Sequence, residues 1–300
     1  MRIYVERIIE APLDQIWKHT QTPDLHERWH LRFTQIEYLP RPNKEKPQQF
    51  LYATRIGFGL KIEGKGETTG IRESSENDRT SALRFWSDDE KSLIREGSGY
   101  WKYKPNGQQV RFLTAYDYQV RFGALGRVFD RFIFRPLMGW ATAWSFDRLG
   151  LWLEKGESPE SSLQWSITHS IARLSLALVW IYHGLVPKLL VRDPTELAMI
   201  QDMGISPDQS VQFAVVAGLL EAAFGLLLLF FWRSRWPLAL TIGLMVFALL
   251  SVSWYSPHML TTAFNVVTLN LLTIALSLID WIACIKAPTA SRCLRTPPSS

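Results

Sequence analysis

The chain of 300 residues is 47% hydrophobic and 20% charged, carries a formal net charge of +5 at pH 7, and is long enough for two domains of ordinary size. The small, dispersed positive charge argues against a nucleic-acid-binding protein, and the two cysteines, Cys284 and Cys293, exclude a disulfide framework or a cysteine-rich metal cluster. Charged residues are frequent in residues 1–165 and sparse in residues 166–300, which indicates two parts of different character.

Residues 1–155 read as a run of strands between two helical segments. Residues 2–11 alternate between apolar and polar side chains, which predicts a strand, and Pro12 then begins a short predicted helix. Asn106-Gly107 is typical of a hairpin turn, and Pro136 is expected to kink a long amphipathic helix over about 124–155. Six further strands are predicted in between, in RFTQIEYL, QQFLYATRIGF, LKIEGKGETTGI, SALRFWSDD, LIREGSGYWKYKP and QQVRFLTAYDYQV.

The segment LHERWH contains an H-E-x-x-H pattern, in which His26 and His30 have the spacing of zinc ligands and Glu27 that of a general base. A catalytic zinc ion needs three protein ligands, and the chain after residue 30 runs into predicted strands without offering the third. We therefore expect no metal site. We expect instead a charged loop at the rim of a ligand cavity, with Trp29 packed inward.

The order of strand, helix, six strands and long helix, together with APLDQIWKHTQTPDLHERWHLRFTQIEYL, resembles the SRPBCC superfamily of START and polyketide-cyclase-like proteins. The resemblance covers residues 1–155 and implies an α+β helix-grip domain, in which a curved antiparallel sheet surrounds a long C-terminal helix and an apolar cavity. Aromatic residues suit such a cavity, but they equally suit an ordinary core, and the sequence leaves both readings open. The residues expected to line the cavity are Trp29, Tyr52, Phe58, Phe85, Trp101, Phe112 and Tyr116.

After a linker at 156–165, four apolar segments are predicted to span a membrane, at 166–186, 211–232, 236–255 and 258–282. Each has the roughly 20 residues that cross about 30 Å of hydrocarbon. Arg233 and Arg235 lie between the second and third spans, and further basic residues follow the fourth. By the positive-inside rule we expect both termini in the cytoplasm and a multi-pass protein of a bacterial-type inner membrane. The Pro-, Ser- and Thr-rich residues 287–300 are expected to be disordered.

Several polar residues lie within or beside these spans. Glu221 is ten residues into the second span, roughly 15 Å deep, and an ionisable group at that depth is a functional candidate. Arg173 is expected to be its partner. The alternative is that such a pair only holds the four helices together. The full predicted set is Arg173, His183, Lys188, Glu221, Asn265 and Asn270.

The second half also resembles the DoxX-like membrane family, through ARLSLALVWIYHGLVPKLL, PTELAMIQDMGIS, AGLLEAAFGLLLL and AFNVVTLNLLTIAL, from about residue 167 to 285. Relatives in that family include a small membrane subunit of a thiosulfate:quinone oxidoreductase and partners in membrane redox complexes. The resemblance therefore implies a quinone as a candidate cofactor, without covalent attachment, and a membrane redox complex as a candidate partner.

Three functions follow from these patterns. In the first, which we favour, the N-terminal domain binds an apolar small molecule (a lipid, quinone or aromatic compound) and the four-span domain anchors or exchanges it. In the second, the chain is an accessory subunit of a quinone-linked oxidoreductase. In the third, it is a membrane-tethered cyclase-like enzyme, whose acid–base group is sought among Glu63, Tyr116 and Asp117. Expected partners are membrane lipid and a hydrophobic small molecule, with a redox complex or a homo-oligomer as alternatives, and no nucleic acid.

Overall fold

A computed structural model describes residues 2–41, 43, 46–57, 59–74, 78–263 and 265–298. The chain divides into two compact units, residues 1–162 with 288–300, and residues 163–287. We call the first unit the cup and the second the membrane unit. The predicted fold class is confirmed, because the cup is a sheet-and-helix domain and the membrane unit consists of helices.

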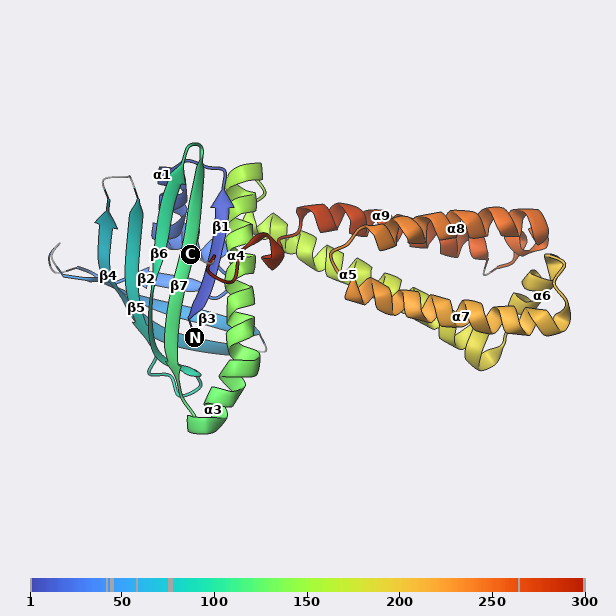
Figure 1. Ribbon diagram of the computed structural model, residues 1–300, viewed down its shortest axis with the longest axis horizontal. Helices are drawn as coiled ribbons and strands as arrows, with labels where there is room; N and C mark the ends of the chain where they lie inside the picture. Colours follow the sequence, from blue (N-terminus) through green and yellow to red (C-terminus); the bar gives the residue numbers. More distant parts are fainter. Residues whose placement is uncertain are drawn as a thin grey trace. The chain divides into compact units, whose positions relative to one another are not determined.

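The cup contains a seven-stranded antiparallel sheet in the order β1-β7-β6-β5-β4-β3-β2 (Figure 1). Two short helices, α1 (Leu13–Gln21) and α2 (Pro23–Trp29), follow the first strand. The alternation of apolar and polar residues gives the sheet one apolar face, which we call the inner face. The strands are β1 (Ile3–Ile9), β2 (Gln35–Tyr38), β3 (Gln48–Gly57), β4 (Leu60–Glu73), β5 (Arg79–Trp86), β6 (Ile94–Asn106) and β7 (Gln109–Val120).

A long helical segment packs against the inner face. It consists of α3 (Gly123–Phe129), a π-helical turn η1 (Asp130–Phe134) and α4 (Arg135–Lys155). Pro136 lies in the first turn of α4, where its missing N–H is tolerated, and the irregular turn η1 stands directly before it. The main core lies between this helix and the sheet, where the rings of Phe112 and Phe146 stack with centroids 4.4 Å apart.

The end of the chain belongs to the cup, which differs from the disordered tail that the composition predicts. Residues 290–292 form a 3-10 turn, η4, and Leu294 pairs with Glu6 at the free edge of β1. Ala290 and Cys293 are buried in the cup core. The Pro- and Ser-rich composition does not reveal this packing, because only a few side chains in the tail make it and each needs a specific partner on β1 or α4.

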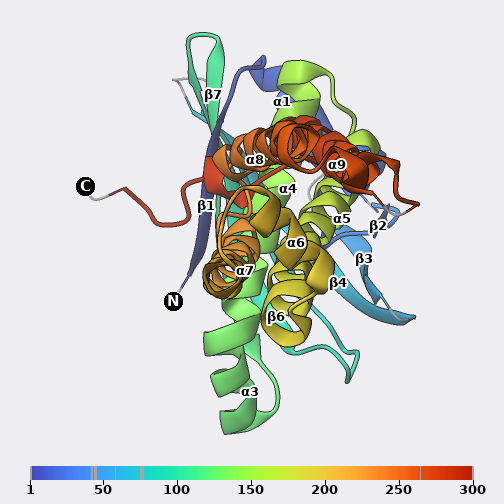
Figure 2. The same ribbon diagram turned by 90° about the vertical axis from the view of Figure 1, so that its right-hand side faces the viewer.

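Among its described residues, the membrane unit contains four helices long and apolar enough to cross a bilayer, which agrees with the predicted number of spans. Figure 2 shows α8 and α9 side by side, as their contacts also indicate. The remaining elements connect or extend the spanning helices. The bounds are α5 (Pro159–His183), a π-helical segment η2 (Gly184–Val191), α6 (Pro194–Asp202), α7 (Pro207–Phe230), α8 (Trp236–Tyr255), η3 (Pro257–Thr261) and α9 (Val266–Lys286).

Two predicted boundaries are wrong. The expected linker at 156–165 is mostly helix, because α5 already begins at Pro159, a residue type that favours the first turn. The fourth span begins at Val266 instead of residue 258, because η3 separates it from α8. Asn265, which we expected to be an intramembrane polar group, is the N-cap of α9, and its side chain accepts a hydrogen bond from the Thr268 backbone N–H at 3.0 Å.

Candidate functional site

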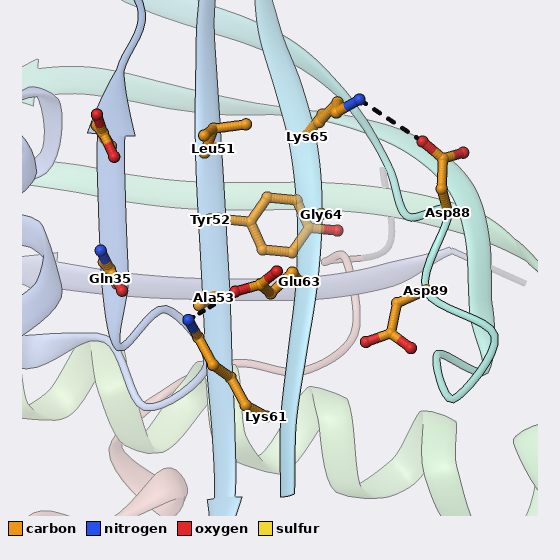
Figure 3. A pocket seen from close by; sticks show the side chains of 11 residues that line it. Gln35, Leu51, Tyr52, Ala53, Lys61, Glu63, Gly64, Lys65, Asp88 and Asp89 are labelled. Carbon is orange, nitrogen blue, oxygen red and sulfur yellow. Dashed lines mark ion pairs between the residues drawn. The ribbon is translucent and has the colours of Figure 1, made fainter.

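The outer face of the sheet carries a polar groove of about 530 Å³ along β2, β3 and β4 (Figure 3). Glu63, one of the expected acid–base candidates, lines this groove and is ion-paired with Lys61 at 2.6 Å. Lys65 and Asp88 face each other nearby at 3.8 Å. All four side chains are exposed to solvent, so these ion pairs are typical of a hydrated surface and offer little for catalysis.

The other two acid–base candidates are held by structural contacts. Asp117 forms an ion pair with Arg135 at 2.8 Å, and this cation helps to keep the pKa of Asp117 below its ordinary value despite partial burial. Tyr116 does point into the cup, where its hydroxyl lies 2.9 Å from the Thr142 hydroxyl on α4. The geometry therefore gives Asp117 and Tyr116 roles in joining the sheet to the long helix.

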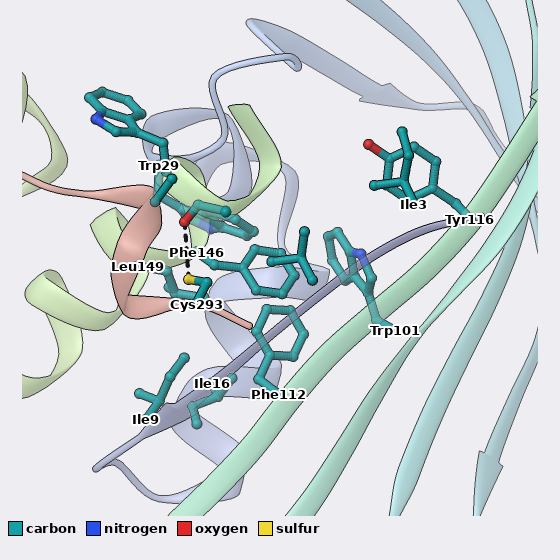
Figure 4. Packing of buried hydrophobic residues seen from close by; sticks show 14 of the residues in the cluster. Ile3, Ile9, Ile16, Trp29, Trp101, Phe112, Tyr116, Phe146, Leu149 and Cys293 are labelled. Atoms are coloured by element: carbon teal, nitrogen blue, oxygen red, sulfur yellow. Dashed lines mark hydrogen bonds between the residues drawn. The ribbon is translucent and has the colours of Figure 1, made fainter. Parts of the chain in front are cut away.

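The aromatic residues expected to line a cavity pack together in the cup core (Figure 4). Tyr52 packs against the edge of that cluster, and Phe58 lies outside the described residues. The fully or largely buried members are Trp29, Phe85, Trp101, Phe112 and Tyr116. A cavity of about 50 Å³ remains beside Phe85 and Trp101. This is far below the roughly 300–1,000 Å³ of ordinary ligand sites.

Glycines on the inner face explain why the cup is so full. The strand register sets Phe85 opposite Gly97, and an added Cβ at Gly97 would lie 2.5 Å from the Phe85 ring. Tyr52 lies in the same way over Gly64, and Phe50 over Gly66. Rings therefore occupy the space that the missing side chains leave. In this conformation the aromatic residues form a core.

The H-E-x-x-H segment lies in the second half of α2, with His30 as the C-cap, and both histidines are buried, so the expected charged loop is wrong. His26 stacks on Trp29 with ring centroids 5.0 Å apart, and burial lowers the pKa of His26 to about 3. Burial lowers the pKa of His30 as well, helped by neighbouring positive groups. Trp29 is packed inward, and its indole N–H donates to the His19 carbonyl. Within the described residues, no group of three potential metal ligands occurs.

The membrane unit contains a charged cluster around Lys188. Its ammonium lies 3.0 Å from Glu196 on α6 and 3.0 Å from Glu221 on α7. Asp193 caps α6 by accepting the Thr195 and Glu196 backbone N–H groups, which fixes the helix that carries Glu196. Lys188 is largely buried, and a buried ammonium needs such partners in an apolar environment.

Glycines also set the register of this cluster. A Cβ at Gly218 would lie 2.7 Å from the Gly184 carbonyl, so α7 and η2 approach as closely as two backbones can. Further along α7, a Cβ at Gly225 would lie 2.8 Å from the Ala177 carbonyl on α5. Glu221 is therefore level with the end of α5, within reach of Lys188.

The expected Arg173–Glu221 pair is wrong. Arg173 lies level with the α7–α8 turn, where it donates to the Ser234 carbonyl at 3.1 Å, and its ion-pair partner is Asp280 on α9 at 2.9 Å. His169 contacts the same carboxylate at 2.5 Å, and all three side chains are buried. The set of polar residues predicted from the sequence does not include Asp280 or His169. The signal that identifies Glu221, an acidic residue in an apolar segment, applies equally to Asp280. Asn270, also expected, is buried on α9.

A pocket of about 670 Å³ opens beside the Lys188 cluster. Its polar lining includes His183 and Glu196, and the rest is mainly apolar. This volume lies in the range of small-molecule sites, which are mostly apolar with a few polar groups. The apolar lining includes Tyr182, Val186, Pro187, Val191, Met199, Met259 and Val266. The arrangement suits a molecule with an apolar body and a polar end.

Comparisons with known proteins agree with the two-part architecture. The model of the DoxX-like family matches residues 177–278, which confirms the resemblance in the membrane unit. The uncharacterised membrane protein YndG of Bacillus subtilis (strain 168) is 50% identical over 184 residues, which are 61% of this chain and 68% of that protein.

Solved structures are similar to the cup at low identity. The hypothetical protein jhp0584 of Helicobacter pylori is 15% identical, with a TM-score of 0.41, and the match covers 51% of this chain and 88% of that one. A STAR-related lipid transfer protein fragment from Xanthomonas axonopodis is 12% identical, with a TM-score of 0.39, over 51% of this chain and 86% of that one.

Proposed function

Because the chain belongs to the family of the Bacillus subtilis membrane protein YndG and contains a DoxX-like domain, we propose that it binds a small amphiphilic molecule within its membrane unit. The ligand has an apolar body and a polar end, as a quinone or a lipid does. One observation carries this proposal: the membrane unit has a mainly apolar pocket of about 670 Å³ beside the partly buried Lys188 and Glu196, whereas the cavity inside the cup core has about 50 Å³.

The polar groups of the pocket suit a ligand that both accepts and donates hydrogen bonds. His183 offers a ring nitrogen of either kind when it is neutral, and the Glu196 carboxylate accepts. Lys188 is shared between Glu196 and Glu221, so it neutralises only one of the two negative charges. A donor on the ligand, such as a quinol hydroxyl, therefore finds an acceptor at Glu196.

Exchange of the ligand with the cup is the second part of the proposal, and it requires the cup to open. The rings of Phe50, Tyr52 and Phe85 would have to move off the inner-face glycines before a lipid-sized molecule could enter. The membrane pocket needs no such rearrangement. We therefore propose that the ligand binds first in the membrane unit.

We also propose that the cup lies on the cytoplasmic side of a bacterial inner membrane. The tail after the fourth spanning helix is part of the cup, which supports placing both ends of the chain on the same side of the membrane. Arg233 and Arg235 in the α7–α8 turn and Lys286 at the end of α9 support the cytoplasmic side by the positive-inside rule.

The test is native mass spectrometry of the full chain, purified from membranes in mild detergent. We expect a co-purified small molecule on the wild-type protein. Met199→Trp fills the pocket and should lower its occupancy at least about tenfold, since a lost apolar site of this kind weakens binding strongly. Leu220→Trp, on the exposed face of α7, is the matched control and should keep the ligand. Equal occupancy in the two variants would contradict the proposal.

A second function, as an accessory subunit of a quinone-linked oxidoreductase, is favoured by the cluster of His169, Arg173 and Asp280. His169 Nε2 is buried and has no hydrogen-bond partner among the described residues, and carboxylate–histidine clusters in membranes are typical of proton relays. Asp280→Asn should lower quinone-dependent oxygen uptake of membranes at an unchanged amount of protein. A parallel loss of protein would mean that the cluster only stabilises the fold.

A further inference from the structure

The segment from α3 to η1 exposes a row of large apolar side chains on the surface of the cup. Leu125 is 78% exposed and Phe132 is 71% exposed. Their spacing is helical. Phe129, Phe132 and Ile133 follow Leu125 by four, seven and eight residues, which puts all four side chains on one face. We call this surface the α3 ridge, and define it by Phe122, Leu125, Val128, Phe129, Phe132 and Ile133.

The opposite side of the same segment is firmly attached to the cup. Asp130 is buried, accepts a hydrogen bond from the Tyr118 hydroxyl at 2.7 Å and pairs with Arg135 at 2.8 Å. Gly126 is also buried, and a Cβ there would collide with the backbone of Arg121. These contacts fix which face of the helix points outward. The exposure of the α3 ridge therefore follows from how the segment is anchored.

The charge beside the ridge has one sign. Arg127 and Arg131 are both exposed and lie four residues apart, so they flank the apolar face along one side. The acidic residue of the segment, Asp130, is buried in its ion pair. Figures 1 and 2 both show α3 projecting past the end of the sheet within the cup. The projecting surface thus combines aromatic and aliphatic side chains with exposed arginines.

We propose that the α3 ridge inserts into the headgroup layer of an anionic lipid surface. Amphipathic helices with Phe and Leu on one face and arginines beside it lie in the plane of a membrane, with the apolar side chains among the acyl chains. Arg127 and Arg131 then meet the lipid phosphates. The four spanning helices keep a bilayer at high local concentration for the rest of the chain. This surface is separate from the pocket of the membrane unit.

The test uses the full chain in phosphatidylcholine vesicles with or without phosphatidylglycerol. A fluorophore is attached at Phe132→Cys in a background of Cys284→Ser and Cys293→Ala, and the matched control carries it at Ser98→Cys, an exposed position on β6. Nitroxide-labelled lipids should quench the label at 132 and leave the label at 98 bright. Aqueous iodide should give the reverse order. Replacing Arg127 by Gln should weaken the lipid contact about fivefold in anionic vesicles, with little effect in neutral ones.

Two results would overturn the proposal. If iodide quenches the label at 132 as strongly as the label at 98, the α3 ridge faces water. If both quenchers fail at 132 and cysteines at that position cross-link to each other, a second copy of the chain covers the ridge. The control for folding is thermal unfolding that matches the unlabelled parent carrying Cys284→Ser and Cys293→Ala, and a match is expected because Phe132 and Ser98 are exposed.

Discussion

The carboxylate of Asp147, fully buried in the middle of α4, is ion-paired at 3.0 Å with Arg292, which follows the last spanning helix. The same carboxylate accepts the Thr289 backbone N–H at 2.7 Å. The cup therefore contains both ends of the chain. Its core is completed only when the residues after the fourth span reach α4.

Removing the Asp147 charge should destabilise the cup strongly. Asp147→Asn leaves the buried Arg7 and the tail residue Arg292 without this partner, and breaking a buried ion pair costs about 3–5 kcal/mol. Arg292→Ala should cost less, about 1 kcal/mol, because Arg292 is 37% exposed. The free energy of unfolding is measured by chemical unfolding followed by near-ultraviolet circular dichroism, which reports the packing of aromatic residues. The control is Arg28→Ala, which breaks an exposed pair with Glu160. An effect of Asp147→Asn as small as that of the control would contradict this role.

Docking of the tail should also protect Cys293 from thiol reagents. Burial raises the pKa of Cys293 to about 12, so almost no thiolate is present at pH 8, and its Sγ donates to the Ala143 carbonyl at 3.2 Å (Figure 4). In a Cys284→Ser background, alkylation of the native chain should be at least about a hundredfold slower than that of the unfolded chain. Arg292→Ala should speed it up. Rapid alkylation of the native chain would mean that the tail is undocked.

The buried histidines predict a loss of stability in acid. The pKa of His26 is about 3 in the folded cup and about 6.5 when unfolded, so the unfolded chain binds the proton more readily between these values. Stability is fully present above pH 6.5 and falls as the pH drops toward 3, by up to about 1.4 kcal/mol per pH unit for this residue. His26→Phe removes the titration and retains a ring against Trp29. Chemical unfolding between pH 4 and 7 should therefore show a flatter pH dependence for the variant, and identical curves would be inconsistent with a neutral buried His26.

The inner-face glycines should tolerate no side chain. Gly97→Ala would bring a methyl group within 2.5 Å of the Phe85 ring and 2.7 Å of the Asp117 carbonyl, an overpacking that costs about 1–3 kcal/mol. Gly70→Ala on β4 meets open space and should stay within about 1 kcal/mol of the wild type. Thermal unfolding of the two variants measures the difference. Equal stability would show that the aromatic rings move aside readily, as an opening cup requires.

The sequence predicts the order of elements well because local patterns determine them. Alternation in residues 2–11 and the turn at Asn106-Gly107 correspond to β1 and to the β6–β7 hairpin. The four apolar segments correspond to the four spanning helices, since roughly 20 apolar residues suffice to identify a span. These features depend on neighbours along the chain.

Pairings between distant residues could not be predicted in the same way. The depth of Arg173 along its predicted span makes it a reasonable ion-pair partner for Glu221. The close approach of the backbones at Gly184 and Gly218, however, sets a helix register in which Glu221 pairs with Lys188. Whether aromatic residues line a cavity or fill a core depends on strand register, which sets Phe85 opposite Gly97. The docking of Arg292 on Asp147 depends on tertiary contacts that composition does not encode.

Photoaffinity mapping distinguishes a ligand held in the membrane unit from a ligand held in the cup. The full chain in vesicles is illuminated with a photoreactive quinone analogue, and the adducts are located by peptide mass spectrometry. We expect adducts at the residues that line the pocket, which lie between 182 and 199 and at Met259, Thr262, Ala263 and Val266. These adducts should disappear with excess unmodified quinone or with Met199→Trp. Adducts concentrated on the cup aromatics Trp29 and Trp101, or spread without competition over the exposed faces of α7 and α8, would contradict binding in the membrane unit.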